Sequence, residues 1–302
     1  MVVSSEGAFV ITVPAEFAVA TVAREGDAGR TWIDALPDLV QALCDQWRLL
    51  VDGSPMHGYL GLAVPVRRGD EPAVLKVSWL DESSRDEAAA LAAWAGQGAV
   101  QLLEVEPALG AMLLERLDYR RSLNDVAIEE AVDIAGRLLR RLAIPPPPGF
   151  RSAPGIAAEL HGNLLGRWEL CGRPLPRRVL DLARDLASQF ASAGGKLLVN
   201  YDLHYGDVLA STREPWLVVD PKVVVGDPEF GVAQLLWRRL EEMEAGCGLE
   251  RFFRQLTAVA ELDPGLARSW SLLRVVDYWL WGLSVGLTED PARCDRIVNW
   301  LI

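Results

Sequence analysis

The sequence has little of what marks secreted, zinc-binding or membrane-spanning proteins. It has only four cysteines, without CxxC spacing, which argues against a disulfide framework and a zinc ribbon. They are Cys44, Cys171, Cys247 and Cys294. The first residues lack a basic segment followed by a long apolar run, and no later apolar run approaches the length of a membrane span. We therefore expect reduced thiols, a cytoplasmic location and no membrane partner.

Positive charge is also scarce. The chain carries 30 Lys and Arg against 42 Asp and Glu, a formal net charge of -12 at pH 7. Nucleic-acid binding depends on basic side chains that neutralise phosphates, so no nucleic-acid partner is expected. Two interpretations of the acidic surplus stay open: a cationic partner, or a charge that simply keeps the protein soluble.

The first part of the chain has the pattern of a small β-rich lobe. Between residues 59 and 80, YLGLAVPV and AVLKVSWL flank the turn-like RRGDEP, which predicts an antiparallel hairpin. A helix is expected from near Ser84, and VQLLEVE and GAMLLERL predict two further strands. This lobe, with its single helix, should end near residue 118.

The remainder is dominated by helical patterns. Apolar positions recur at helical spacing from Asp125 to Ile144, with Asn124 and Asp125 available as N-caps, and the tetraproline that follows must end this helix. Residues 176 to 193 and 232 to 244 are also expected to be helical. The stretch from Phe252 to the end predicts a packed helical bundle. With 302 residues, 50% of them hydrophobic, the chain is long enough for two packed lobes.

Acidic residues that suit phosphoryl transfer concentrate between residues 197 and 230. LLVN predicts a strand, YDLHYGDV a loop, VLA and WLVVD a hairpin, and DPKVVVGDP a second loop. Phosphoryl transfer requires a carboxylate beside the attacking hydroxyl and oxygen ligands for Mg²⁺. Asp202 suits the first role, and Asp207 with Asp220 suit the second.

The same segment resembles the catalytic block of the aminoglycoside phosphotransferase family. The usual loop of that family is His-Gly-Asp-Leu-His-x-x-Asn, followed by a strand that ends in Ile-Asp. DLHYGDVL and REPWLVVDPKVVVGDPEF are similar in particular to the streptomycin 6-kinase and hydroxyurea phosphotransferase branch. RTWIDALPDLV, the LKV strand and LLERLD extend the similarity upstream.

The resemblance implies an α+β, protein-kinase-like two-lobed fold. Residues 1–118 would be a small, mostly β, nucleotide-binding lobe, and residues 119–302 a larger, mostly helical lobe for catalysis and substrate binding. The implied activity is an ATP-dependent O-phosphotransferase that uses Mg²⁺ and acts on a hydroxyl of a small molecule. An aminoglycoside such as streptomycin is one candidate acceptor.

Site residues follow from the resemblance position by position. It implies that Asp202 is the catalytic base or hydroxyl-orienting group and that Asp220 is a magnesium ligand. Asp207 stands where the family has a metal-binding Asn, and its carboxylate is also a competent magnesium ligand.

The resemblance also assigns nucleotide contacts in the first lobe. Lys76 would contact the α- and β-phosphates, although a solvent-facing strand lysine is the plainer alternative. The strand end from Glu115 to Leu117 would hold adenine through its backbone. Glu87 would pair with Lys76, or would instead complete a capping box with Ser84 at the start of the helix.

Three departures from the family pattern leave a second function open. Asn200 replaces the usual His, Asp207 replaces Asn, and Gly231 replaces an Asp that usually follows GDPEF. A catalytically impaired pseudokinase or nucleotide-binding module is therefore the alternative. Retention of Asp202, Asp220 and Lys76 together favours the active enzyme.

Several acids in the second lobe would suit the ammonium or guanidinium groups of a cationic acceptor. They are Glu229, Glu241, Glu242, Glu244 and Asp277. A solvated helix face is the simpler explanation for the acids between Glu241 and Glu244.

Overall fold

The computed structural model describes residues 11–192, 194–246 and 248–302. Its contacts divide the chain into two compact units, Met1–Gly96 with Val100–Leu117 and Gln97–Ala99 with Asp118–Ile302. The roles assigned to residues 1–118 and 119–302 stay predictions. Among the described residues, no helix combines the length and the apolar character needed to cross a membrane.

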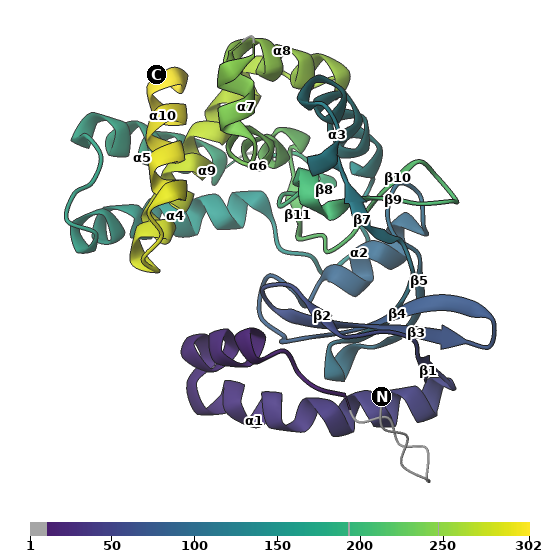
Figure 1. Ribbon diagram of the computed structural model, residues 1–302. Coiled ribbons are helices and arrows are strands. Elements are labelled where there is room, and N and C mark those ends of the chain that lie inside the picture. The colour runs from purple at the N-terminus through teal and green to yellow at the C-terminus, as the bar shows by residue number, and fades with distance from the viewer. Residues whose placement is uncertain (1–10, 193, 247) are drawn as a thin grey trace. The chain divides into compact units, whose positions relative to one another are not determined.

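The N-terminal unit contains a six-stranded antiparallel sheet (Figure 1). Its strand order is β1-β3-β4-β6-β5, and β2 pairs with β3. The bounds are β1 Leu50–Val51, β2 Met56–His57, β3 Gly61–Arg68, β4 Glu71–Ser78, β5 Leu102–Glu106 and β6 Ala111–Glu115. The predicted hairpin and the two further strands are thus confirmed. Helix α2 (Glu87–Trp94) follows the hairpin and begins three residues later than expected.

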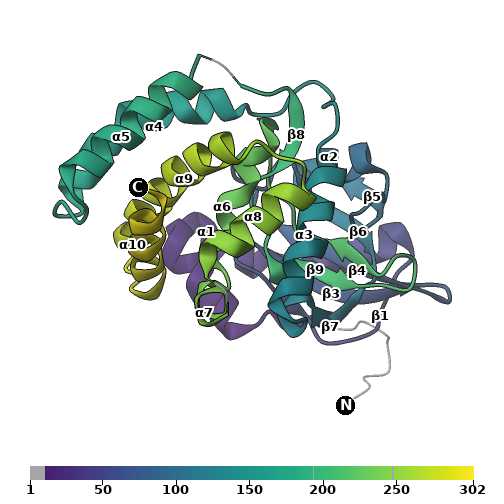
Figure 2. The same ribbon diagram turned by 90° about the horizontal axis from the view of Figure 1, so that it is seen from above.

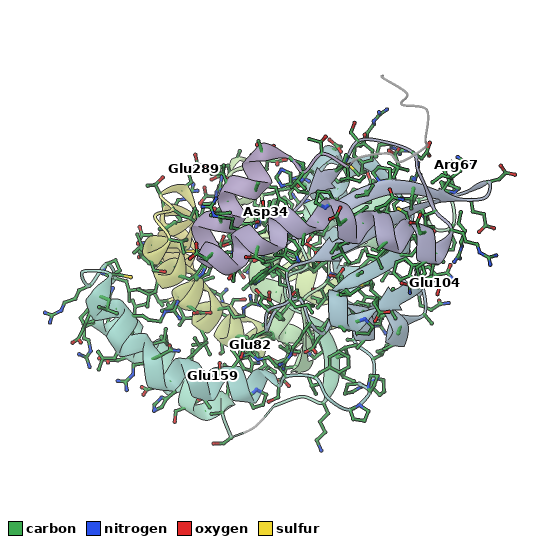
Figure 3. The ribbon with its side chains drawn as sticks, turned by 90° about the horizontal axis from the view of Figure 1, so that it is seen from below. Asp34, Arg67, Glu82, Glu104, Glu159 and Glu289 are labelled. Atoms are coloured by element: carbon green, nitrogen blue, oxygen red, sulfur yellow. The ribbon has the colours of Figure 1, made fainter. Side chains whose placement is uncertain are left out.

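A long helix precedes the sheet, and the prediction of a single helix in this unit was wrong. Helix α1 spans Ala15–Trp47 and is interrupted at Gly26, whose φ of 64° is not helical. Ile33, Leu36, Val40 and Leu43 recur on one face and are buried, whereas Asp34 is exposed to solvent (Figure 3). This periodicity is what forms the helix.

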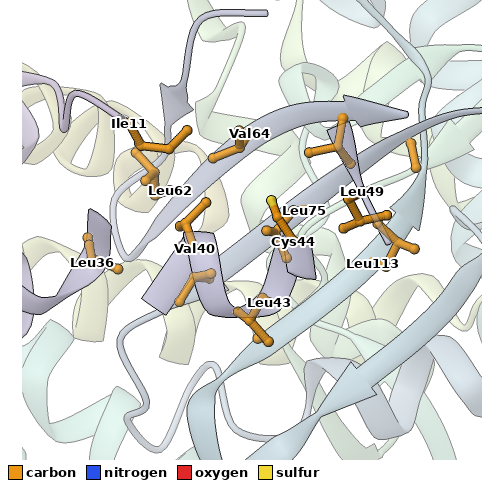
Figure 4. Close-up of a cluster of buried hydrophobic side chains, with 14 of the residues drawn as sticks. Ile11, Leu36, Val40, Leu43, Cys44, Leu49, Leu62, Val64, Leu75 and Leu113 are labelled. Atoms are coloured by element: carbon orange, nitrogen blue, oxygen red, sulfur yellow. The ribbon is translucent and has the colours of Figure 1, made fainter. Parts of the chain in front are cut away.

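The core of the N-terminal unit lies between α1 and the sheet. Figure 4 shows Leu36, Val40 and Leu43 of α1 near the inward-facing side chains of β3, β4 and β6, such as Leu62 and Leu75. All of these side chains are almost fully buried. The apolar face that α1 supplies therefore stabilises the sheet whose strand β4 carries Lys76.

The C-terminal unit contains two small sheets. One has the order β10-β9-β7 and the other pairs β8 with β11, all antiparallel. The bounds are β7 Asp118–Ser122, β8 Leu197–Asn200, β9 Val208–Ala210, β10 Trp216–Val218 and β11 Val223–Gly226. The hairpin of β9 and β10 is confirmed. The expected second loop is corrected, because the three valines of VVVG form β11, as suits β-branched residues.

Helices make up most of the described C-terminal unit. The expected helical regions are confirmed among the described residues, except that a break at residues 238–239 divides the region 232–244 into two short helices; residue 193, the end of another expected region, lies outside the described residues. The bounds are α3 Ile128–Leu142, α4 Ala153–Leu170, α5 Arg177–Phe190, α6 Val232–Trp237, α7 Leu240–Ala245, α8 Leu249–Val259, α9 Pro264–Ser284 and α10 Glu289–Leu301. Figure 2 shows α4 and α5 side by side with α9 next to them. The predicted caps of α3 were wrong: Ala127 is its N-cap residue, and Asp125 instead bonds with Ser122 around a preceding 3₁₀ turn.

Three cysteines, Cys44, Cys171 and Cys294, are free thiols, as expected. Cys247 lies outside the described residues.

Candidate active site

The end of strand β8 determines the position of Asp202. β8 ends at Asn200, which pairs with Val223 at the start of β11. The Tyr201 N–H then donates to the Lys222 carbonyl at 2.9 Å, so the ladder continues one residue beyond the strands. The Asn200 side-chain oxygen accepts a bond from the Asp202 N–H at 3.2 Å. The chain therefore leaves the strand in a fixed turn, with Asp202 directly after the paired backbone.

Both carboxylate oxygens of Asp202 have protein donors. Lys222 Nζ lies 2.7 Å from Oδ2, and Gln234 Nε2 lies 2.7 Å from Oδ1. Burial opposes the charge on Lys222, yet Asp202 and Asp220 hold the pKa of Lys222 above its ordinary value. Asp202 is thus presented as a carboxylate in a fixed plane beside a cation.

Asp207 and Asp220 lie next to each other because they stand at adjacent ends of one hairpin. Asp207 precedes β9 and Asp220 follows β10. Val208 of β9 pairs with Val218 of β10. The Val219 N–H donates to the Asp207 carbonyl at 2.8 Å. Asp220 has a φ of 49°, the left-handed region that non-glycine residues rarely adopt. Such a conformation is common where a chain turns sharply at a functional site.

His204 and neighbouring acids set the charge state of Asp207. Burial raises the pKa of the Asp207 carboxyl, and the nearby charges of Asp220 and Asp202 raise it further. His204 Nε2 lies 2.9 Å from Asp207 Oδ2 and opposes this rise. This contact joins the side chains of His204 and Asp207 within the loop.

The donor set at the hairpin suits Mg²⁺ bound together with phosphates. Across the described part of the chain, no three His, Cys, Asp or Glu side chains gather closely enough to hold a metal ion by themselves. Mg²⁺ usually keeps several waters and takes one or two carboxylates together with substrate phosphates. The oxygens of Asp207 and Asp220 fit that requirement, and their role as ligands stays a prediction.

In the N-terminal unit, Lys76 of β4 is paired with Glu87 of α2. Its Nζ lies 2.7 Å from both carboxylate oxygens, and the Glu87 side chain is only 2% exposed. The alternative capping box is wrong, because α2 begins at Glu87 with Asp86 as an N-cap residue that makes no side-chain cap bond. Ser84 Oγ instead donates to the Trp79 carbonyl. The interpretation of Lys76 as a solvent-facing residue is also wrong.

The segment from Glu115 to Leu117 is anchored by the residue between them. Glu115 ends β6, and its N–H donates to the Gln101 carbonyl at 2.9 Å. The Arg116 guanidinium bonds the carbonyls of Val66 and Ala73 and lies 2.8 Å from the Asp52 carboxylate. The strand end is therefore held firmly, while adenine binding by Glu115 and Leu117 stays a prediction.

Besides Asp207, the departures from the family pattern are Asn200 and Gly231, and both occupy tightly packed positions. Gly231 has no room for a side chain: a Cβ atom there would lie 2.7 Å from Leu139 Cδ1 and 2.8 Å from the Asn200 carbonyl oxygen. Arg274 of α9 bonds the carbonyls of Tyr201 and Phe230, at 2.7 and 3.1 Å. These contacts hold the backbone directly before Asp202 and directly before Gly231.

The acids proposed to receive a cationic acceptor already have partners. Four contact arginine side chains, and Glu229 accepts a bond from the Asp263 N–H. The pairs are Glu241 with Arg293 and Arg296, Glu242 with Arg239, Glu244 with Arg296, and Asp277 with Arg167. A solvated, ion-paired helix surface therefore describes Glu241 to Glu244 better than a binding site.

Sequence reasoning missed Lys222, Gln234, Arg274 and Arg116. Lys222 stands two residues after Asp220 in DPK, and this closeness to a candidate site residue was a local signal for it. Gln234 and Arg274 lie on helices distant in sequence, and no local pattern connects them with Asp202.

Comparisons with known proteins show the family of the chain. The model of the aminoglycoside/hydroxyurea antibiotic resistance kinase family matches residues 46–286. A hydroxyurea phosphotransferase of Kitasatospora aureofaciens is 38% identical over 94% of this chain and 84% of its own length. A streptomycin 6-kinase of Streptomyces glaucescens is 34% identical over 94% of this chain and 95% of its own length.

Solved structures show the same fold. Crystal structures of aminoglycoside phosphotransferase APH(4)-Ia, and of its thermostable mutant in a ternary complex with AMP-PNP and hygromycin B, each have a TM-score of 0.61 at 17% identity. Each alignment covers 86% of this chain and 97% of the other chain. The predicted α+β, protein-kinase-like fold class is confirmed.

Proposed function

Because the chain belongs to the aminoglycoside/hydroxyurea antibiotic resistance kinase family, we propose that it transfers the γ-phosphoryl group of ATP to a hydroxyl of a small molecule. The observation that carries this proposal is the placement of Asp202, Asp207 and Asp220. Two carboxylates stand at adjacent hairpin ends, and the third is held on the neighbouring loop by Lys222 and Gln234.

Asp202 is the group that receives the acceptor. Its carboxylate orients the hydroxyl and takes the proton as the hydroxyl oxygen forms a bond to the γ-phosphorus. The bond between the γ-phosphorus and the bridging oxygen breaks, and its electron pair leaves on ADP. Asp207 and Asp220 would hold Mg²⁺, which neutralises phosphate charge when bound.

The N-terminal unit supplies the nucleotide contacts. Glu87 holds Lys76 at 2.7 Å, so its ammonium group has a defined position from which to contact the α- and β-phosphates. The anchored strand end from Glu115 to Leu117 offers backbone groups to adenine. A cytoplasmic location follows from the need for ATP.

Streptomycin and hydroxyurea are the first acceptors to test, because relatives named for them align with nearly the whole chain. A cationic acceptor such as streptomycin would have to share acids with the arginines that now pair with them, Asp277 among them. Asn200 and Gly231 do not favour the pseudokinase alternative, since both lie in well-packed backbone around an ordered Asp202.

The decisive experiment measures ADP release with ATP and Mg²⁺, using streptomycin, hydroxyurea and a panel of other hydroxylated compounds. Asp202→Asn should lower turnover by about 10³-fold and leave AMP-PNP affinity nearly unchanged, because the carboxylate acts on the transfer step. Asp34→Asn, at an exposed site on α1, is the matched control and should behave as the wild type. AMP-PNP binding without ADP release for any acceptor would contradict the proposal and leave a nucleotide-binding module.

A further inference from the structure

We propose that Lys222 and Gln234 are positioning residues that hold the Asp202 carboxylate in the orientation needed to receive the acceptor hydroxyl. This inference rests on the proposed function, since it presumes that Asp202 is the reacting carboxylate. It assigns a purpose to two side chains that were not anticipated from the sequence.

Backbone pairing places Lys222 opposite the residue that precedes Asp202. The Lys222 carbonyl accepts the Tyr201 N–H at 2.9 Å, directly beyond the paired Asn200 and Val223. Arg274 holds the Tyr201 carbonyl at 2.7 Å. The contact between Lys222 and Asp202 is therefore built into the register of β8 and β11, unlike a chance surface ion pair.

Gln234 approaches the other oxygen from a rigid, buried element. It lies on α6, all six residues of which are buried, and it is itself only 3% exposed. Its side-chain amide donates to Asp202 Oδ1 at 2.7 Å. A neutral donor in this position fixes the plane of the carboxylate without adding a second positive charge.

This arrangement leaves Asp202 able to react. Each carboxylate oxygen has two acceptor sites, so one donor on each oxygen restricts rotation and still leaves lone pairs for the acceptor hydroxyl. The Asp202 side chain is 20% exposed and that of Lys222 is 26% exposed, so the carboxylate is not sealed by its partners. Defined orientation of a reacting group is worth much in rate, and a small misplacement can cost about 10²-fold.

The choice of lysine at this site is unusual for the chain. Among its 30 Lys and Arg, only Lys76, Lys196 and Lys222 are lysines. An ammonium group acts as a compact point charge, whereas a guanidinium tends to engage both oxygens of a carboxylate at once. Lysine at position 222 therefore leaves Oδ1 of Asp202 to accept the bond from Gln234. An arginine there would engage both oxygens and displace Gln234.

The first test separates turnover from nucleotide binding. Lys222→Met should lower kcat by about 10²-fold and Gln234→Leu by about 10-fold, with the KM for ATP and the affinity for AMP-PNP unchanged. Lys196→Met, which removes an exposed lysine, is the matched control and should keep wild-type kinetics. Wild-type kcat in Lys222→Met, or a loss confined to the KM for ATP, would overturn the proposal.

Lys222→Arg keeps the charge and guards against a folding defect. This variant should unfold at the wild-type temperature. It should recover only part of the kcat lost in Lys222→Met, because the planar guanidinium group changes the orientation of Asp202. Full recovery would show that charge alone suffices, and positioning would then be excluded.

The last test asks whether Lys222 acts through Asp202. In the Asp202→Asn background, Lys222→Met should cause no further loss of kcat, because residues that act as a unit are not additive. A further loss of about 10²-fold would show an independent role and overturn the inference. Failure of the proposed function would look different, since the wild type itself would then bind AMP-PNP and release no ADP with any acceptor.

Discussion

Each unit contains a lysine paired with a carboxylate, and the two pairs differ in how they are enclosed. In the N-terminal unit, Lys76 lies 2.7 Å from both oxygens of Glu87, and the two side chains are 13% and 2% exposed. In the C-terminal unit, Lys222 reaches one oxygen of Asp202, Gln234 takes the other, and Lys222 and Asp202 are 26% and 20% exposed.

The two carboxylates therefore differ in what they do: Glu87 positions a lysine, whereas Asp202 is itself positioned by two donors. Glu87 uses both oxygens on Lys76, which fixes the ammonium group and leaves the carboxylate almost inaccessible. Asp202 is oriented by two different donors and stays reachable. In the proposed function, the lysine of the first pair contacts phosphate, and the carboxylate of the second pair receives the acceptor hydroxyl.

The largest expected effect concerns stability and should separate the two pairs. Lys76→Met leaves the buried Glu87 carboxylate without its ammonium partner, which should lower the free energy of unfolding by about 4 kcal/mol. Lys222→Met should cost clearly less, because Asp202 keeps Gln234 and contact with solvent. Urea unfolding of both variants measures the difference.

A double variant controls for this stability effect. Lys76→Met combined with Glu87→Leu removes the buried charge and should regain most of the lost stability, yet should not regain ATP binding. Equal losses of stability in Lys76→Met and Lys222→Met would mean that both pairs are buried to the same extent, which would contradict the difference described above.

Close backbone packing around the C-terminal pair predicts the next effect. Gly231→Ala would force a Cβ atom to within 2.7 Å of Leu139 Cδ1, so it should lower the free energy of unfolding by about 2 kcal/mol. Gly162→Ala, in α4 where a Cβ would meet nothing, is the matched control and should be neutral or slightly stabilising. Wild-type stability in Gly231→Ala would show that the loop is not packed as described.

Local patterns allowed much of the fold to be predicted. The hairpin of β3 and β4, the helix ending before the tetraproline and the hairpin of β9 and β10 each have their signal within a few residues. Helix α1 was missed because Gly26 and Pro37 interrupt its pattern, and β11 was missed because VVVG is a short run between Pro221 and Pro228. These errors arose where breaker residues stand inside or beside a regular element.

Contacts between distant segments account for what was missed in the site. The pair of Lys76 and Glu87 was one of two alternatives at the sequence level, and the strand and helix that carry these residues follow each other closely. Gln234 and Arg274 reach the Asp202 loop from helices that follow it by tens of residues, and only the packing of the unit brings them there. Their side chains are ordinary in their own helices, so nothing local marks them.

Asn200 should show a smaller effect, confined to the start of the Asp202 loop. Asn200→Ala removes the oxygen that accepts the Asp202 N–H and should lower the free energy of unfolding by about 1 kcal/mol. Asn163→Ala, at an exposed site on α4, serves as the control. Thermal or urea unfolding checks the difference. An unchanged stability in Asn200→Ala would show that this bond does not hold the loop.

The smallest expected effect concerns charge at the hairpin ends. Burial, together with Asp220 and Asp202, raises the pKa of the folded Asp207 carboxyl, so ionisation at neutral pH costs folding free energy. That cost disappears as the pH falls through the raised pKa. His204 Nε2 lies 2.9 Å from Asp207 Oδ2 and opposes this rise, so the whole effect should stay below about 1 kcal/mol.

Asp207→Asn should therefore make the metal-free protein slightly more stable at pH 7 and remove that pH dependence. It should also shrink the rise in melting temperature on adding Mg²⁺, because a ligand that binds the folded state more weakly stabilises it less at the same concentration. Thermal melts in chelator and in excess Mg²⁺ measure both quantities, with Asp34→Asn as the control. An Asp207→Asn variant with the same Mg²⁺-induced shift as the wild type would place Asp207 outside the metal site. The C-terminal unit would then bring only Asp220 of the two hairpin acids to the ion.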